Sequence, residues 1–125
     1  MKESICSSKA PAPVGPYSQA VRAGSLVFVS GQLGMDPEDA SLPPDVVAQA
    51  RQAMDNLMAI LVEAGGLAEH VVKTTIFLAN MDDFSTVNGI YESYFQAPFP
   101  ARACVEVARL PKDAKVEVEA VAILP

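Results

Sequence analysis

Residues 100–120, PARACVEVARLPKDAKVEVEA, contain two β-type segments separated by the turn-forming residues LPKDA. Because residues two apart share a face of a strand, Arg102, Cys104 and Glu106 are expected on one face of the first segment. A hairpin that keeps like faces together sets Glu106 opposite Glu117. That register predicts that Arg102 and Glu117 share one face of the sheet.

Two interpretations of this charged face stay open from the pattern alone. In the first, the face is solvated and its cross-strand ion pairs contribute about 0 to 1 kcal/mol each. In the second, Val121 and Ile123 extend the Glu117 face into an apolar surface that a second subunit covers. An arginine at the rim of such an interface can bind a carboxylate through two parallel N–H bonds. That arrangement suits a small anionic substrate with an electrophilic or basic centre.

The bulk composition favours one acidic, oligomeric domain over residues 1–125. Hydrophobic residues make up 50% of the chain and charged residues 19%, which leaves more apolar surface than one small core hides, so an oligomer is expected. The net charge of −6 opposes a phosphate-binding surface and makes nucleic acid an unexpected partner. The N-terminus lacks a signal-peptide apolar region, and no run reaches the roughly 20 apolar residues of a membrane helix. A cytoplasmic protein without a membrane partner is expected.

Few residues are candidates for metal or nucleophile chemistry. Cys6 and Cys104 lie far apart without CxxC or Cys/His spacing, so neither a disulfide framework nor a metal site is expected. His70 is the only histidine. We expect it to be exposed or to have a capping role, and it would have to be the base of any Ser/His/Asp triad. A nucleophilic Cys104 would need a nearby base or a lowered pKa, and no histidine lies near it in sequence.

The hydrophobic pattern predicts an α+β fold in the order β-β-α-β-α-β-β. The segment APAPVGP is expected to be extended, with ordered structure starting near Tyr17. Before residue 100 the pattern predicts strands over 17–24 and 25–34, a helix over 46–64, a strand over 71–79 and a helix over 84–95. Two helices on one face of a mixed sheet leave the other face as a candidate subunit interface.

Five stretches along nearly the whole chain carry a resemblance to a known family. They are APAPVGPYSQAV, SGQLGMDP, AQARQAMDNL, VVKTTIFLANMDDFSTVN and FPARACVEVARLPKDAKVEVEA. In this order they resemble the Rid family of reactive intermediate or imine deaminases, also called the YjgF family, and its RidA branch in particular. The resemblance implies a fold similar to chorismate mutase and a homotrimer whose sheets form a central barrel. It also implies three sites in the clefts between subunits.

The chemistry that the resemblance implies is hydrolysis of 2-imino acids to 2-keto acids and ammonia. The substrates would be 2-iminopropanoate and 2-iminobutanoate, formed from the 2-aminoacrylate and 2-aminocrotonate that pyridoxal-phosphate dehydratases release. No cofactor is implied. Because a protonated imine is a better electrophile, an adjacent carboxylate can both stabilise the cation and transfer a proton to or from water.

The same resemblance implies roles for particular residues. Arg102 would hold the substrate carboxylate, with the backbone N–H of Gly31 as a second donor and Ser30 beside it. Glu117 would position or activate the attacking water. Arg102 nearby favours an ionised Glu117 and desolvation opposes it, so the sequence leaves the protonation state of Glu117 open.

Three further matches complete the predicted site. Cys104 matches a family residue that acts largely through its backbone, and Tyr17 and Asn88 match residues that close the pocket. Without the resemblance, Tyr17 reads equally well as an aromatic at a strand start, and Asn88 as a helix-surface residue. The connector QAPFP, residues 96–100, is about three residues shorter than is usual in the family, which would reshape one wall of the pocket.

Members of the Rid family have also been described as translation inhibitors with ribonuclease activity, as chaperone-like proteins and as ligand-binding regulators. The acidic charge and the single histidine oppose the ribonuclease alternative, because one histidine cannot supply both an acid and a base. A non-catalytic binder of 2-keto acids is the stronger alternative. Arg102 and Gly31 would serve such a binder equally well, whereas Glu117 would have no use in it.

Overall fold

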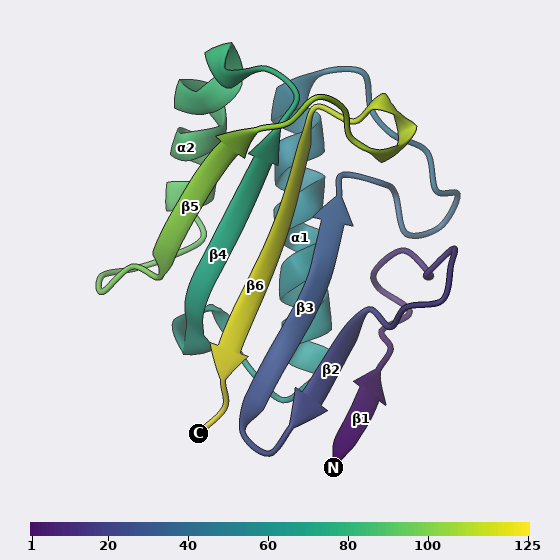
Figure 1. Cartoon of the computed structure of the whole chain (residues 1–125), viewed down its shortest axis with the longest axis vertical. Helices are drawn as coiled ribbons and strands as arrows, with labels where there is room; N and C mark the ends of the chain where they lie inside the picture. Colours follow the sequence, from purple (N-terminus) through teal and green to yellow (C-terminus); the bar gives the residue numbers. More distant parts are fainter.

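The computed structural model describes the whole chain, residues 1–125, as a six-stranded sheet with two helices packed on one face (Figure 1). The helices are α1 (Val46–Glu63) and α2 (Phe84–Glu92). The strands are β1 (Lys2–Ile5), β2 (Ala20–Ala23), β3 (Leu26–Leu33), β4 (Val71–Leu78), β5 (Ala101–Glu106) and β6 (Val116–Ile123), in the spatial order β1-β2-β3-β6-β4-β5. Only the β4–β5 pair is parallel, so the sheet is mixed, as predicted. Neither helix combines the length and apolarity that crossing a bilayer would require.

The chain begins with a strand that the sequence pattern did not predict. β1 pairs with β2 from Lys2↔Ala23 to Ile5↔Ala20, so the expectation that ordered structure starts near Tyr17 was wrong. The segment KESI has no apolar alternation because it forms an edge strand, where exposed polar residues are tolerated and discourage further strand pairing.

The two final strands do not form the predicted hairpin. β6 lies in the middle of the sheet between β3 and β4, and β5 lies at the edge in parallel with β4. The segment between them contains a 3₁₀ turn, Pro111–Asp113, rather than a tight hairpin turn. The alternate residues of β6 that face the helices, Val116, Val118, Ala120 and Ala122, are all buried. Because a central strand such as β6 is hydrogen-bonded along both edges, the alternation of its apolar residues does not determine which strands pair with it.

This topology places Arg102 and Glu117 on opposite faces of the sheet, which corrects the prediction that they share one. Arg102 is in register with Thr74, which is fully buried beneath the helices. Glu117 is in register with Phe77, and the side chain of Phe77 lies on the opposite face of β4 from the buried Thr74. Side chains of paired residues point to the same face, so Arg102 projects toward α2 and Glu117 toward the open face.

Both predicted helices form, although α2 ends at Glu92 rather than at residue 95, and they bury the core against one face of the sheet. Asp45 Oδ1 accepts a hydrogen bond from the backbone N–H of Ala48 at 2.8 Å and caps α1. The helix ends before Gly65, whose φ of +94° favours glycine. The largest fully buried side chains of α1 are Leu57, Ile60 and Leu61.

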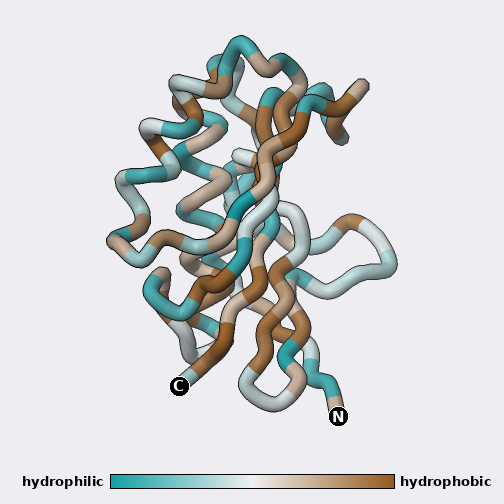
Figure 2. The backbone as a smooth tube through the Cα atoms, turned by 60° about the vertical axis from the view of Figure 1, so that its left-hand side comes forward, coloured by the Kyte–Doolittle hydropathy of each residue, from teal (hydrophilic) through white to brown (hydrophobic).

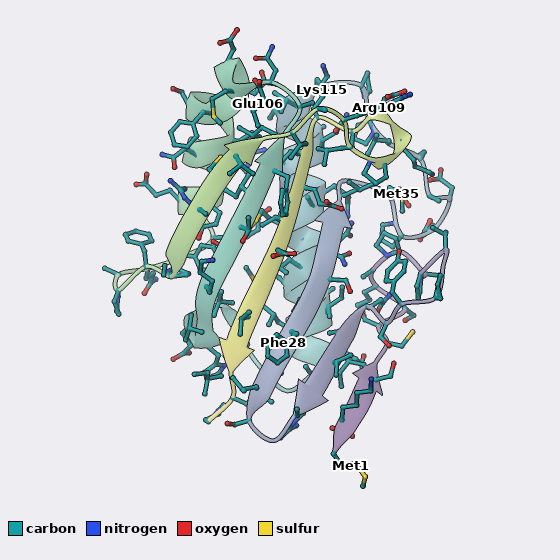
Figure 3. The ribbon with its side chains drawn as sticks, in the orientation of Figure 1. Met1, Phe28, Met35, Glu106, Arg109 and Lys115 are labelled. Carbon is teal, nitrogen blue, oxygen red and sulfur yellow. The ribbon has the colours of Figure 1, made fainter.

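The open face of the sheet carries exposed apolar side chains. Hydrophobic stretches run along the strands (Figure 2), although helices cover only one face. Phe28 lies on the face that points away from α1 (Figure 3) and is 48% exposed. Leu26, Val105 and Ile123 are also exposed large hydrophobic residues of this face. Several exposed large apolar side chains on one face are typical of an interaction surface.

Candidate functional site

The predicted site residues fall into two separate hollows of the chain. We call the first the Glu117 hollow; its lining includes Tyr17, Ser30, Gly31 and Glu117, together with the segment after β1 and the turn before β6. Its volume is about 490 Å³, which is within the range of small-molecule sites. We call the second the Arg102 hollow; it is lined by Asn88, Tyr91, Glu92, Phe99, Pro100 and Arg102 and has a volume of about 430 Å³.

Glu117 lies directly over the backbone of Gly31. A Cβ atom built on Gly31 would be 2.7 Å from Cδ and 2.8 Å from Oε2 of Glu117, so only glycine leaves room for the carboxylate there. The pairing of β3 with β6 shifts register between Val29 and Gln32, which places Ser30 and Gly31 in an irregular stretch. Such irregularities redirect side chains and are common next to functional sites.

The environment of Glu117 disfavours its charged form. Burial raises the pKa of the half-buried Glu117 carboxyl above its ordinary value, and the negative charge of neighbouring Glu119 raises it further. The sequence left open whether desolvation or a nearby charge dominates at Glu117, and in this chain desolvation is the larger influence on its pKa. A carboxyl with a raised pKa exchanges protons more readily at neutral pH than an ordinary glutamate does.

Gln19 holds the segment that carries Tyr17 against the Glu117 hollow. This glutamine is 2% exposed, its Oε1 accepts a hydrogen bond from the N–H of Ser7 at 2.6 Å, and its Nε2 donates to the carbonyl of Pro11 at 2.9 Å. Tyr17 itself is 49% exposed at the rim. Sequence reasoning missed Gln19, and the only available signal was a polar residue inside the apolar segment YSQAV.

Ser30 is tied to the same segment and does not point freely into the hollow. Its hydroxyl donates to the carbonyl of Ser18 at 2.7 Å, and its backbone N–H donates to the carbonyl of Gln19 at 2.9 Å. Ser30 therefore helps to hold the loop in place, and its hydroxyl proton is already engaged.

The Arg102 guanidinium is held by α2 and has no carboxylate partner within the chain. Its Nη1 donates to Asn88 Oδ1 at 2.7 Å, and its Cζ lies 5.0 Å from the ring centroid of Tyr91 and 5.6 Å from that of Phe84. The ion pairs of the structure join other residues, Arg22 with Glu3 and Arg109 with Asp113. A guanidinium has five N–H donors, so most of those on Arg102 are free for a ligand.

The environment of Cys104 does not activate its thiol. Cys104 shares the helix face of β5 with Arg102 and is partly buried against the core. Burial raises the pKa of the Cys104 thiol, and the Arg102 charge opposes this only in part. A thiol with a raised pKa is a poor nucleophile at neutral pH.

The lone histidine has the predicted capping role. His70 Nδ1 accepts a hydrogen bond from the backbone N–H of Leu67 at 2.9 Å. Nowhere does the chain bring together three or more His, Cys, Asp or Glu side chains that could hold a metal ion.

Within one chain, then, the structure groups Tyr17, Ser30, Gly31 and Glu117 in one hollow and Asn88 and Arg102 in the other. The first set faces the open side of the sheet or its rim, and the second faces α2. Arg102 and Glu117 therefore lie in different hollows, on opposite faces of the sheet.

Comparison with known proteins identifies the family of this chain. The family model described as Endoribonuclease L-PSP matches residues 7–124. A 2-iminobutanoate/2-iminopropanoate deaminase of Escherichia coli strain K12 is 49% identical, with 98% of each chain covered. A mouse protein of the same name is 50% identical, covering 98% of this chain and 92% of the mouse protein.

Solved structures agree with the sequence relatives. The crystal structure of E. coli TdcF with bound serine superposes with a TM-score of 0.95 at 44% identity, covering 98% of this chain and 99% of TdcF. The structure of RidA from an Antarctic Psychrobacter gives the same TM-score and identity over the same shares of the two chains. The chain belongs to the Endoribonuclease L-PSP family, which is the YjgF or Rid family.

Proposed function

We propose that this chain is a cofactor-independent deaminase that hydrolyses 2-iminopropanoate and 2-iminobutanoate to 2-keto acids and ammonia. The observation that carries the proposal is the Arg102 guanidinium, which Asn88 orients while its remaining donors stay free of any carboxylate of the chain. Two relatives named 2-iminobutanoate/2-iminopropanoate deaminase are 49% and 50% identical to this chain over nearly its full length.

The chemistry uses the two hollows together. The free edge of Arg102 binds the substrate carboxylate through two parallel N–H bonds. Glu117, in its charged form, accepts a proton from water as the water oxygen adds to the imine carbon. That proton passes to the imine nitrogen and gives a carbinolamine. A second proton then moves from the carbinolamine hydroxyl through Glu117 to the amino nitrogen as the C–N bond breaks, which gives ammonia and the 2-keto acid. Because its pKa is raised, Glu117 is better suited than an ordinary glutamate both to accept and to donate a proton near neutral pH.

The proposal requires an assembly, and we propose a homotrimer in which sheets line a central barrel. Arg102 and Glu117 lie on opposite faces of one chain, so one complete site combines the Arg102 hollow of one copy with the Glu117 hollow of another. The exposed apolar residues Phe28, Val105 and Ile123 on the open face supply a surface for such contacts. Burial of such surface stabilises association by about 25 cal/mol per Å².

The test is keto-acid release from imines generated in situ. A pyridoxal-phosphate dehydratase supplies 2-aminoacrylate or 2-aminocrotonate, and release is followed with wild type, Arg102→Ala, Glu117→Gln and the control Arg109→Ala. Arg109 is an exposed arginine paired with Asp113, so its loss changes the net charge without touching either hollow. We expect Arg102→Ala and Glu117→Gln to lose most of the acceleration and Arg109→Ala to keep it. A wild type that does not exceed the spontaneous rate contradicts the proposal.

A second candidate function is non-catalytic binding of 2-keto acids. It is favoured by the related TdcF structure, which holds the carboxylate-bearing molecule serine. Titration calorimetry with 2-ketobutyrate distinguishes the two functions when combined with the kinetic assay. A regulator of this kind binds 2-ketobutyrate but leaves imine hydrolysis at the spontaneous rate, and Glu117→Gln leaves its affinity unchanged.

A further inference from the structure

Tyr91 connects the Arg102 guanidinium to the buried core. The guanidinium Cζ lies over the Tyr91 ring, 5.0 Å from its centroid. The hydroxyl of Tyr91 forms a 2.7 Å hydrogen bond with Thr74 Oγ1, and the two residues are only 5% and 0% exposed. Thr74 belongs to β4, the strand paired with β5. The ring is therefore fixed to the strand next to the one that carries Arg102.

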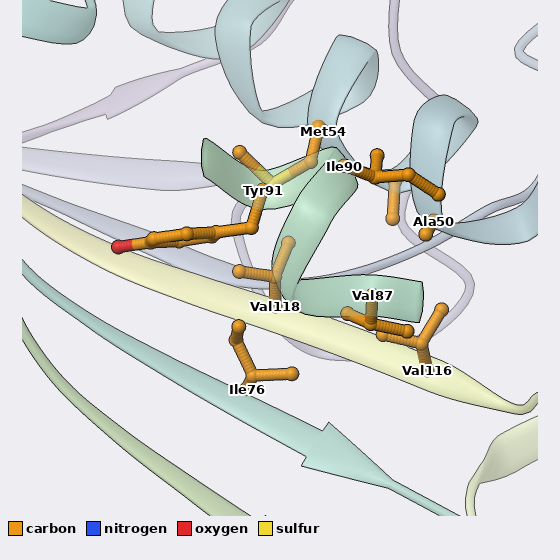
Figure 4. A pocket seen from close by; sticks show the side chains of 9 residues that line it. Ala50, Met54, Ile76, Val87, Ile90, Tyr91, Val116 and Val118 are labelled. Atoms are coloured by element: carbon orange, nitrogen blue, oxygen red, sulfur yellow. The ribbon is translucent and has the colours of Figure 1, made fainter. Parts of the chain in front are cut away.

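The same ring separates the Arg102 hollow from the interior. Tyr91 lines that hollow on one side and, on the other, a small apolar cavity of about 10 Å³ between the helices and the sheet (Figure 4). In Figure 4 its phenol oxygen points away from the neighbouring apolar side chains Val87 and Ile90. A phenylalanine would fill this space equally well. The hydroxyl therefore serves the bond to Thr74 rather than the packing.

The Tyr91 ring matters for Arg102 because Arg102 is an exposed residue. An exposed arginine loses substantial rotamer entropy when a ligand fixes it, which weakens binding. Asn88 accepts one bond from Nη1, and this leaves the edge formed by Nε and Nη2 free for a carboxylate. The Tyr91 ring restricts the guanidinium plane, so that edge is already presented before a ligand arrives.

We propose that Tyr91, anchored by Thr74, is a positioning residue that orients the Arg102 guanidinium to receive a carboxylate. The identity of that carboxylate as a 2-imino or 2-keto acid rests on the proposed function, whereas the orientation of Arg102 does not. A ring beneath a guanidinium contributes an amount that corresponds to about a 2- to 30-fold change in affinity.

The test compares Tyr91→Leu, which removes the ring, with Tyr91→Phe, which keeps it. Tyr94→Leu is the matched control, because Tyr94 lies on the same segment but bonds to Asp55 Oδ1 of α1 at 2.7 Å instead of contacting Arg102. Three readouts are taken: the affinity for 2-ketobutyrate, the separate kcat and KM for 2-iminobutanoate, and the ¹⁵N-detected Nε–Hε signal of Arg102. The signal is assigned by its absence in Arg102→Lys.

We expect Tyr91→Leu to weaken 2-ketobutyrate binding and raise KM by about 2- to 30-fold, with a smaller change in kcat, and to broaden the Arg102 signal. Tyr91→Phe keeps the ring but loses the bond to Thr74, so it should weaken binding less than Tyr91→Leu does and still broaden or shift the Arg102 signal. Tyr94→Leu should change none of the three readouts. Unchanged affinity and signal in Tyr91→Leu, or an equal loss in Tyr94→Leu, overturns the proposal.

Two safeguards keep the outcome decisive. If Tyr91→Leu does not fold, Thr74→Val replaces it, since this variant removes only the anchor; a sharp, unshifted Arg102 signal in Thr74→Val then overturns the proposal. If wild type neither hydrolyses imines nor binds 2-ketobutyrate, the proposed function fails. In that case, comparing the Nε–Hε signal of Arg102 between wild type and Tyr91→Leu still decides whether Tyr91 orients Arg102.

Discussion

Substituting Gly31 by alanine tests whether the position of the Glu117 carboxylate matters for activity. The added Cβ would lie 2.7 Å from Glu117 Cδ and 2.8 Å from Oε2. Since carbon atoms pack at about 3.5–4.0 Å, the carboxylate must move by roughly 1 Å. The displaced atoms are the end of a flexible side chain, so the fold can absorb the change.

The expected result is loss of activity with little loss of stability. A misplacement of about 1 Å costs on the order of 100-fold in rate, so kcat/KM for 2-iminobutanoate should fall by about that factor, or about 2.7 kcal/mol of transition-state stabilisation. The free energy of unfolding should change by less than about 1 kcal/mol, because only a side-chain end is displaced. Steady-state kinetics and urea unfolding on the same preparation measure the two quantities.

Gly34→Ala is the matched control in the same strand region. A Cβ on Gly34 would overlap the backbone of Gln49 in α1, which cannot rotate aside as a side chain does. We therefore expect Gly34→Ala to lower the unfolding free energy by about 1–3 kcal/mol. The reasoning is refuted if Gly31→Ala retains kcat/KM within about 3-fold of wild type, or if it destabilises the fold as much as Gly34→Ala.

Three further predictions follow from single residues. Burial raises the pKa of Glu117 above its ordinary value of 4.5, so the protonated carboxyl stabilises the fold below pH 4.5 and this contribution is lost as the pH rises through the raised pKa. Relative to wild type, Glu117→Gln should therefore be more stable at about pH 7 than at about pH 4. Urea unfolding at one protein concentration measures this, and an equal difference between the two proteins at both pH values would contradict it. Cys104→Ser should keep kcat/KM within about 10-fold of wild type, because burial raises the thiol pKa; a loss as large as that of Arg102→Ala would instead make the thiol catalytic. Gly89→Ala should raise the unfolding free energy by about 0.5–1 kcal/mol, because Gly89 is an exposed residue inside α2 with open space at its Cβ; thermal unfolding that shows no gain would count against this.

Much of the local structure was predictable because its signals lie close together in the sequence. The helix that begins after Asp45 and ends before Gly65 follows from a capping residue, an apolar period and a glycine terminator. The predicted bounds of 46–64 differ by one residue from the observed end at Glu63. The candidate chemistry of Arg102 and Glu117 was also visible, because an arginine and a glutamate inside apolar strands stand out.

The sequence alone determined the two helices, five of the six strands and which charged residues are unusual, but not the polar edge strand β1. The tertiary structure decided which strands pair, and this overturned the hairpin between β5 and β6 and the shared face of Arg102 and Glu117. It also revealed the anchoring of Tyr91 by Thr74, a residue 17 positions away in the sequence. The physical reason is that alternation within a strand specifies two faces but neither its partner nor which face is buried. Those choices depend on contacts between distant segments, which local periodicity does not encode.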